Sequence, residues 1–205
     1  MTQRGTLYTI SAPSGAGKTS LVAALLEKRP NLQVSISHTT RPKRPGESDG
    51  VNYHFVNKEQ FKTMLDQQAF LEHAEVFNNS YGTSRQWVDD TLASGCDVIL
   101  EIDWQGAAQI HMQLPDTVSI FVLPPGRDTL FERLTQRGQD GPEIIAQRIA
   151  EAQAEMSHFA DADYLIINDN FATALEELAL IISSGKLLLK KQQCQHQALI
   201  KELLL

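Results

Sequence analysis

A glycine-rich segment near the N-terminus, SAPSGAGKTS (residues 11–20), has the residue types that hold phosphate groups. Gly15 and Gly17 have no side chains, so backbone N–H groups can approach phosphate oxygens closely. Lys18 offers a positive charge to the β- and γ-phosphates, and the Thr19 hydroxyl can ligate Mg²⁺. The segment follows the apolar run LYTI and precedes LVAALL, the context of a phosphate-binding loop. We therefore predict a site for a nucleoside triphosphate and Mg²⁺.

The loop departs from the strict pattern G-x-x-x-x-G-K-[ST] at its first position, where Ala12 replaces glycine. Alanine adds only a methyl group, which matters if that position needs a positive φ. Kinases, GTPases and motor ATPases share this loop, so it indicates a nucleoside triphosphate and no particular reaction. The residues predicted to contact the triphosphate are Ser14, Gly15, Ala16, Gly17, Lys18, Thr19 and Ser20.

A second basic cluster lies in the segment SISHTTRPKRPGESDGVNY, where Arg41 and Arg44 stand three residues apart in a proline-rich turn. Two guanidinium groups on one turn can bind the oxygens of a second phosphate in bidentate geometry. Tyr53 and Tyr81 could each add a hydroxyl donor. A solvent-exposed basic turn has the same composition, so the arginines alone leave both interpretations open.

Five stretches of the chain decide between these interpretations. They are SGAGKTS, SxSxTTRPxRPGExxGxxYxF (35–55), FLEHAEVFNNSYGT (70–83), VILEIDWQGA (98–107), and RLTQRG with the later QRI (133–149). In these motifs and in their order the sequence resembles the guanylate kinases, a family of nucleoside monophosphate kinases with a P-loop fold, over nearly all of its 205 residues. The resemblance implies phosphoryl transfer from ATP to GMP, giving ADP and GDP, with Mg²⁺, in purine nucleotide metabolism.

The resemblance also implies roles for individual residues. Those that would contact GMP are Ser37, Arg41, Arg44, Glu47, Tyr53, Glu72, Tyr81, Thr83 and Asp103. Two residues on the ATP side, beyond the loop, are Arg133 and Asn168. The residues that would surround the transferred phosphoryl group are Lys18, Arg41, Arg137 and Arg148.

Several of these residues also have purely structural interpretations. Glu101 and Asp103 flank an apolar position at the end of a predicted central strand, where ligands bind in open α/β sheets, but either carboxylate could simply cap a following helix. Glu72 could be an exposed charge at the end of a helix, and Arg148 could belong to a surface ion pair. Two functional alternatives are a guanylate kinase-like scaffolding domain that binds proteins without catalysis, and a kinase for another monophosphate. Lys18 and Thr19 argue against the first, because such domains typically lack a working phosphate loop.

The elements that must position these residues alternate along the chain. Apolar runs typical of strands cover residues 7–11, 34–37, 97–102, 118–123 and 164–167. Helical spacing occurs in residues 18–28, 85–93, 127–136, 143–157 and 172–183. This alternation predicts an α/β fold in which helices flank a buried parallel sheet on both faces.

Three segments depart from the alternation. Residues 38–84 are polar, turn-rich and aromatic, which predicts a small α+β subdomain inserted into a single domain whose core is 1–37 and 85–205, and the resemblance implies that this subdomain binds the monophosphate. The glycines and proline of residues 135–143 predict a short lid. Residues 186–205 look helical and could pack on the body or on a second copy of the chain, as in a homo-oligomer.

Composition narrows the class of protein. A hydrophobic content of 42% and a charged content of 21% are ordinary for a soluble globular chain. The net charge of −7 argues against nucleic acid as a partner. We see neither a membrane-spanning run nor a signal peptide, and the two cysteines do not indicate disulfides. We therefore predict a cytoplasmic protein, and the resemblance implies that its partners are the small molecules ATP and GMP.

Overall fold

The computed structural model describes residues 4–76, 78–136, 149–150 and 152–205. Its larger layer is a five-stranded sheet in the order β2-β7-β1-β8-β9. The strands are β1 (Leu7–Ser11), β2 (Leu32–Val34), β7 (Asp97–Glu101), β8 (Val118–Leu123) and β9 (Tyr164–Ile167). All their pairings are parallel, so their carboxyl ends meet at one edge of the sheet.

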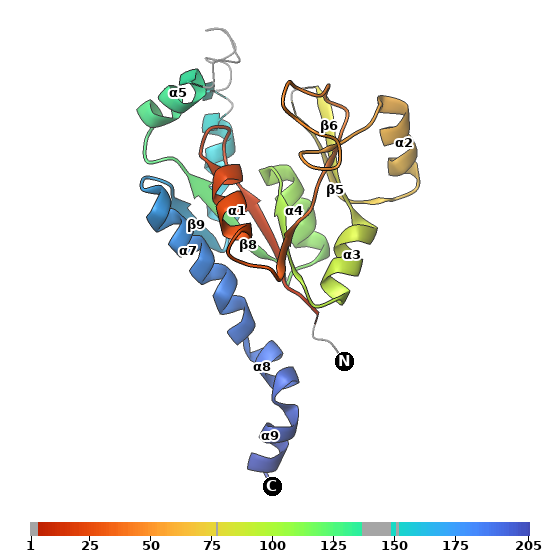
Figure 1. The fold of residues 1–205 in the computed structure, drawn as a ribbon, viewed down its shortest axis with the longest axis vertical. Coiled ribbons are helices and arrows are strands. Elements are labelled where there is room, and N and C mark those ends of the chain that lie inside the picture. Colours follow the sequence, from red (N-terminus) through yellow and green to blue (C-terminus); the bar gives the residue numbers. More distant parts are fainter. Residues whose placement is uncertain (1–3, 77, 137–148, 151) are drawn as a thin grey trace.

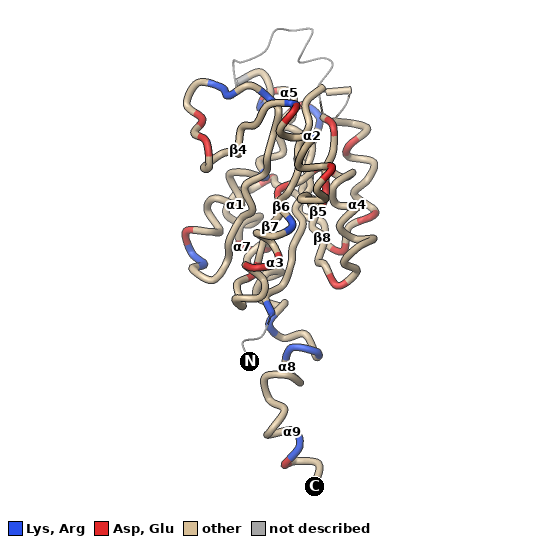
Figure 2. The backbone as a smooth tube through the Cα atoms, turned by 90° about the vertical axis from the view of Figure 1, so that its right-hand side faces the viewer, with Lys and Arg blue, Asp and Glu red and all other residues tan. Residues whose placement is uncertain are grey.

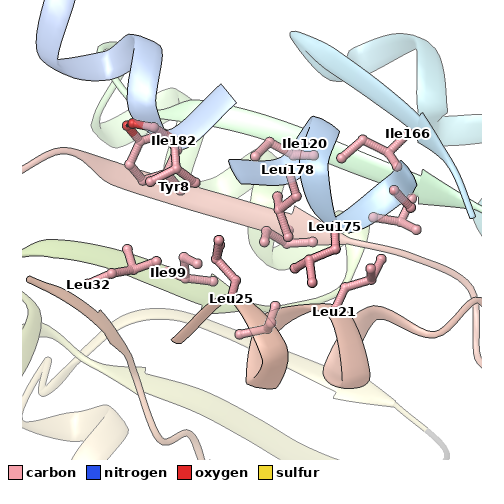
Figure 3. Close-up of a cluster of buried hydrophobic side chains, with 14 of the residues drawn as sticks. Tyr8, Leu21, Leu25, Leu32, Ile99, Ile120, Ile166, Leu175, Leu178 and Ile182 are labelled. Carbon is pink, nitrogen blue, oxygen red and sulfur yellow. The ribbon is translucent and has the colours of Figure 1, made fainter. Parts of the chain in front are cut away.

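Helices cover both faces of this sheet (Figure 1). Because side chains alternate between the faces of a strand, Ile99 packs with α1 (Lys18–Leu26) and α7 (Phe171–Ser184), whereas Val98 packs with α3 (Arg85–Ala93) and α4 (Trp104–Gln113). Figure 3 shows the first of these two apolar layers, in which Leu21, Leu25 and Leu178 face strand residues. Two-sided burial explains why the strands read as continuous apolar runs.

A second, mixed sheet stands beside the core in the order β4-β3-β6-β5. Its strands are β3 (His38–Thr39), β4 (His54–Phe55), β5 (Phe70–Val76) and β6 (Asn79–Ser84), and α2 (Lys58–Asp66) packs on it through Phe61. The β3–β4 pair is parallel, and the β3–β6 and β5–β6 pairs are antiparallel. The predicted fold class, a parallel sheet between helices with a second mixed sheet, is confirmed. The domain division at residues 38–84 stays a prediction.

Side chains of α4 tie the second sheet to the core. Gln109 donates from Nε2 to the carbonyl of His73 and accepts from its N–H, at 2.7 and 3.1 Å. Gln113 donates from Nε2 to the carbonyl of Leu71 at 2.9 Å. The first residues of β5 are therefore fixed to α4, and Figure 1 shows the two elements side by side.

Several predicted bounds need correction. The strand predicted at 34–37 is wrong in position, because β2 covers Leu32–Val34 and the Ser37 carbonyl already accepts from His54 of the second sheet. Helix α4 was missed, since its sequence WQGAAQIHMQ buries only Gly106 and Ile110. Helix α1 ends two residues early, β7 is one residue shorter than predicted, and α7 extends one residue further at each end.

The remaining elements lie toward the C-terminus. Helix α5 (Arg127–Gln136) has the predicted bounds, while the rest of the predicted lid, residues 137–143, lies outside the described residues. Residues 149–150 and 152–156 are helical and lead into η1 (Ser157–Asp161), whereas 143–148 and 151 of the predicted helix are not described. After η2 (Gly185–Leu187), the tail forms α8 (Leu189–Gln195) and α9 (Gln197–Leu203).

The tail projects from the body (Figure 1). At its start, Lys190 pairs with Asp116 and Lys191 pairs with Asp97 of the core. Basic and acidic positions are interspersed over the face seen in Figure 2. Among the described residues, no helix has the length and apolar character needed to cross a bilayer.

Candidate active site

A cleft of about 310 Å³ opens at the carboxyl edge of the parallel sheet, between the glycine-rich loop and the second sheet. It brings together most of the predicted site residues. Those on its lining are Ser14, Gly15, Gly17, Lys18, Thr19, Ser37, Arg41, Arg44, Glu47, Tyr53, Glu72, Tyr81 and Asp103. Five described residues of the prediction lie off this lining, namely Ala16, Ser20, Thr83, Arg133 and Asn168. Arg137 and Arg148 lie outside the described residues.

Left-handed glycines shape the loop. Gly15 and Gly17 both have φ of 92°, a conformation that side chains disfavour, and Gly17 begins α1 as its N-cap. Among the described residues, the non-glycine positions with positive φ are Gln68 and Asn78, so Ala12 has an ordinary backbone. The departure from glycine at Ala12 therefore brings no backbone strain to the loop.

Two residues from later in the chain hold the loop from behind. Asn168 follows β9 and donates from Nδ2 to the Ala16 carbonyl at 2.7 Å. Arg133 of α5 donates to the same carbonyl at 3.4 Å and to the Asn168 carbonyl at 3.1 Å. A side chain at Gly17 would collide with the Asn168 amide. Asn168 and Arg133 therefore position the loop, and a direct contact of either with ATP stays a prediction.

The reactive end of the cleft combines one ammonium group with oxygen ligands. Lys18 donates from Nζ to the Ile102 carbonyl at 3.2 Å, and burial lowers the pKa of its ammonium while the carboxylate of Glu101 opposes this shift. The Thr19 hydroxyl donates to Glu101 Oε2 at 2.9 Å. Glu101 was missing from the predicted site, although its place at the end of a central strand is where ligands bind in open α/β sheets.

Asp103 has the structural role that was left open for it. Its Oδ1 accepts from the Gly106 N–H at 2.9 Å, which makes it the N-cap of α4. It also lines the cleft, two residues after Glu101. The capping bond therefore holds the carboxylate of Asp103 at the edge of the cleft.

The arginine turn faces the loop across the cleft. Arg41 pairs with Glu47 at 2.6 Å, and Glu47 also accepts from the Arg44 N–H at 2.8 Å. The bond from Arg41 holds the pKa of Glu47 below its ordinary value. The Arg41 guanidinium lies 5.3 Å from the ring centre of Tyr53, whose ring meets Tyr81 edge-on. Glu47 therefore orders the turn, and both arginines line the cleft.

A buried carboxylate marks the opposite wall. Glu72 lies in β5 and is 3% exposed, so its interpretation as an exposed helix-end charge is wrong. Thr83 of β6 donates to Glu72 Oε1 at 2.5 Å. Burial raises the pKa of Glu72 to about 7, against the bond from Thr83. Ser37 lines the same cleft, so an acceptor pair and a hydroxyl are present for a polar ligand.

A glycine-rich loop at the edge of a parallel sheet, opposed across a cleft by a turn of the second sheet that carries two arginines, is the arrangement expected of a kinase. A family model described as guanylate kinase matches residues 4–185. Two similar relatives are guanylate kinases from Saccharophagus degradans, 61% identical over 100% of both chains, and from Escherichia coli K12, 56% identical over 98% of both. The crystal structure of guanylate kinase from Anaplasma phagocytophilum superposes with a TM-score of 0.76 at 32% identity, covering 89% of this chain and 87% of that one.

The chain belongs to the guanylate kinase family. The predicted enzyme class and reaction, phosphoryl transfer from ATP to GMP, are confirmed by these comparisons.

Asn168→Asp tests the support of the loop. The substitution replaces the amide donor by an oxygen that repels the Ala16 carbonyl, so we expect KM for ATP to rise about tenfold, or roughly 1.4 kcal/mol. KM for GMP should change by less than about twofold. Steady-state kinetics with each substrate varied in turn measures both values. If the loop binds phosphates, UTP as donor should lose as much as ATP; a loss confined to ATP would indicate an adenine contact instead.

GMP binding should depend on pH through Glu72. Guanine presents two N–H donors, and the carboxyl loses one acceptor when it is protonated. With a pKa of about 7 in the free protein, the ionised form is lost as pH falls, so affinity should be constant above about pH 8 and weaken below about pH 7. Calorimetry from about pH 5.5 to 8.5 would measure this.

The matched control for this titration is Glu72→Gln, because the GMP phosphate itself titrates near pH 6. Both proteins share the phosphate titration, so the difference between their profiles isolates the carboxyl. Parallel profiles for the two proteins would exclude a titrating Glu72.

Proposed function

We propose that the glycine-rich loop binds the triphosphate of ATP and the second sheet binds GMP, with the phosphoryl group passing between them in the cleft. The observation that carries this proposal is the position of Lys18 and the Arg41–Arg44 turn on the lining of one cleft. All three side chains are cationic. Lys18 follows β1 of the parallel sheet, and Arg41 and Arg44 follow β3 of the second sheet. Two phosphorylated substrates held in this way face each other with their phosphates together.

Catalysis in this proposal is positioning and neutralisation of charge. The acceptor is already an anionic phosphate oxygen, so a strong base is not required. Negative charge spreads over the transferred group in the transition state, and fixed cations stabilise it. Lys18 and Arg41 are the described residues that we assign to this role. Arg137 and Arg148, which lie outside the described residues, remain predicted partners in it.

Mg²⁺ is the metal that this chemistry requires, and the residues present fit it. The Thr19 hydroxyl and the Glu101 carboxylate are hard oxygen donors that lie together at the base of the loop. We propose that these two residues hold the ion, with Glu101 acting directly or through water. Held by Thr19 and Glu101, the ion would supply positive charge that neutralises the triphosphate.

Guanine selection is assigned to Glu72, Thr83 and Ser37. The carboxylate of Glu72 accepts from the guanine N1–H and 2-amino groups, whereas adenine has neither group. Thr83 holds the carboxylate from the side, and Ser37 offers a hydroxyl to the base. A site built on buried hydrogen bonds rejects an analogue that lacks them by roughly 10⁴ to 10⁵.

We further propose that residues 38–84 act as a GMP-binding subdomain and that residues 135–143 form a lid. Closure of both would exclude water and so suppress hydrolysis of ATP. The bonds from Gln109 and Gln113 to β5 support a pivot at that strand.

The cellular setting is part of the same proposal. A cytoplasmic location fits two free cysteines, Cys96 and Cys194, and nucleotide substrates. We propose ATP and GMP as the partners and exclude nucleic acid on the net charge of −7. Sedimentation of the protein with and without residues 186–205 would measure whether copies of the chain assemble through the tail.

Lys18→Met tests the loop. Removing one preorganised cation should lower kcat by about 10² to 10³, because its charge is needed most in the transition state. The methionine keeps much of the side-chain volume, so the melting temperature should change little. A coupled assay of ADP formation with a thermal melt measures both; turnover within about threefold of wild type would remove Lys18 from catalysis.

Arg44→Ala tests the assignment of the second sheet. The arginine lies on the turn opposite the loop, so we expect Kd for GMP to rise about tenfold or more while Kd for ATP stays within about twofold. Calorimetry on each nucleotide separately gives the two values. Lys43→Ala is the matched control, since it removes a neighbouring exposed cation of the same turn that is absent from the cleft lining. Equal losses for GMP and ATP would contradict an acceptor-phosphate site.

A further inference from the structure

The first turn of α4 lies directly against the Glu72 carboxylate, and Gly106 is the residue at that contact. A Cβ atom built on Gly106 would lie 2.5 Å from Glu72 Oε2 and 3.1 Å from Glu72 Cδ. Real Cβ atoms essentially never approach another heavy atom within 3.0 Å. The carboxylate therefore occupies the volume that any other residue at position 106 would fill with its side chain.

Backbone conformation does not explain the glycine. Gly106 is not among the described residues with positive φ, so an L-residue is compatible with its backbone. The N–H that Asp103 caps is present in every residue except proline. Space for the carboxylate is the requirement that remains.

The backbone of β5 and the residue Ile102, which lie on either side of this contact, cannot easily move away. On one side, Gln113 and Gln109 bind the backbone of β5, which fixes the distance between that strand and α4. On the other side, a Cβ atom added at position 106 would lie 3.3 Å from the Ile102 Cβ. The group with most freedom is the end of the Glu72 side chain. A methyl group at position 106 would therefore displace the carboxylate and strain its bond from Thr83.

We infer that Gly106 is a specificity-determining residue for the guanine base: its missing side chain sets where the Glu72 carboxylate stands. This inference rests on the proposed function, in which Glu72 accepts hydrogen bonds from guanine. Gly106 is a positioning residue, because it acts through Glu72.

Gly106→Ala is the direct test, with Gly126→Ala as the matched control because nothing lies within 4 Å of a Cβ at that position. We expect KM for GMP to rise about tenfold and the ratio of kcat/KM for GMP over AMP to fall with it. KM for ATP should stay within about twofold of wild type, and kcat at saturating GMP within about threefold. The control variant should match wild type in every value. A GMP value within about twofold of wild type, or a parallel rise for ATP, would overturn the inference.

A double variant separates displacement of the carboxylate from a general packing defect. Glu72→Asp shortens the side chain by one methylene and withdraws the carboxylate from position 106. We expect the rise in KM for GMP in the Gly106→Ala, Glu72→Asp protein to be at least about fivefold smaller than the product of the rises in the two single variants. This difference corresponds to a coupling free energy of about 1 kcal/mol. Additive effects would count against the inference. If Gly106→Ala does not fold, the double variant should restore folding; failure of both to fold would show that the obstacle is not the carboxylate.

The proposed function and this inference fail in different ways. If Glu72→Gln leaves KM for GMP unchanged, Glu72 does not read the base and the proposed function is wrong at that residue. If Glu72→Gln weakens GMP and Gly106→Ala does not, the base contact stands and only the role of Gly106 is lost.

Discussion

The parallel pairing of β1 with β7 is the constraint on which the rest of the site depends. Its register places Ile10 beside Glu101, so the chain enters the glycine-rich loop next to Glu101 at the end of β7 and Asp103 just after it. The Thr19 hydroxyl then bonds to the Glu101 carboxylate, and the Lys18 ammonium bonds to the Ile102 carbonyl. A parallel sheet brings all carboxyl ends to one edge, and helices on both faces keep that edge rigid. The loop, the proposed ion site and the cap of α4 therefore share one origin.

The contact between α4 and β5 also encloses the Glu72 carboxylate, whose ionised form is disfavoured by burial. Burial of Glu72 raises its pKa to about 7, because a charged group loses hydration there. The hydrogen bonds from Thr83 and the charge of Lys18 compensate only in part. Two N–H donors from a base would complete the set of bonds. In the proposed function, hydrogen bonds from the guanine base would replace the hydration that the Glu72 carboxylate loses on burial.

Several features could be predicted because their causes are local. The phosphate loop, β1, β8, β9, α3 and α5 follow from glycine positions, apolar runs and helical spacing, each of which acts over a few residues. Helix α4 was missed because its apolar pattern is weak and its glycine lowers helix propensity. The polar side chains of Gln109 and Gln113 hold this helix against β5 through hydrogen bonds. Such a polar contact between elements leaves little periodic signal in the sequence.

The sequence by itself determined the kinds of groups at the site and their family: Lys18, Thr19, the Arg41–Arg44 turn and Glu72 were identified from residue types and motifs. Tertiary structure alone decided which of them act on one another. The bond from Thr19 to Glu101, the support of Ala16 by Asn168 and the space that Gly106 leaves for Glu72 join residues far apart in the chain. The physical reason is that such contacts depend on strand order and register, which the packing of the whole core sets and no local propensity encodes.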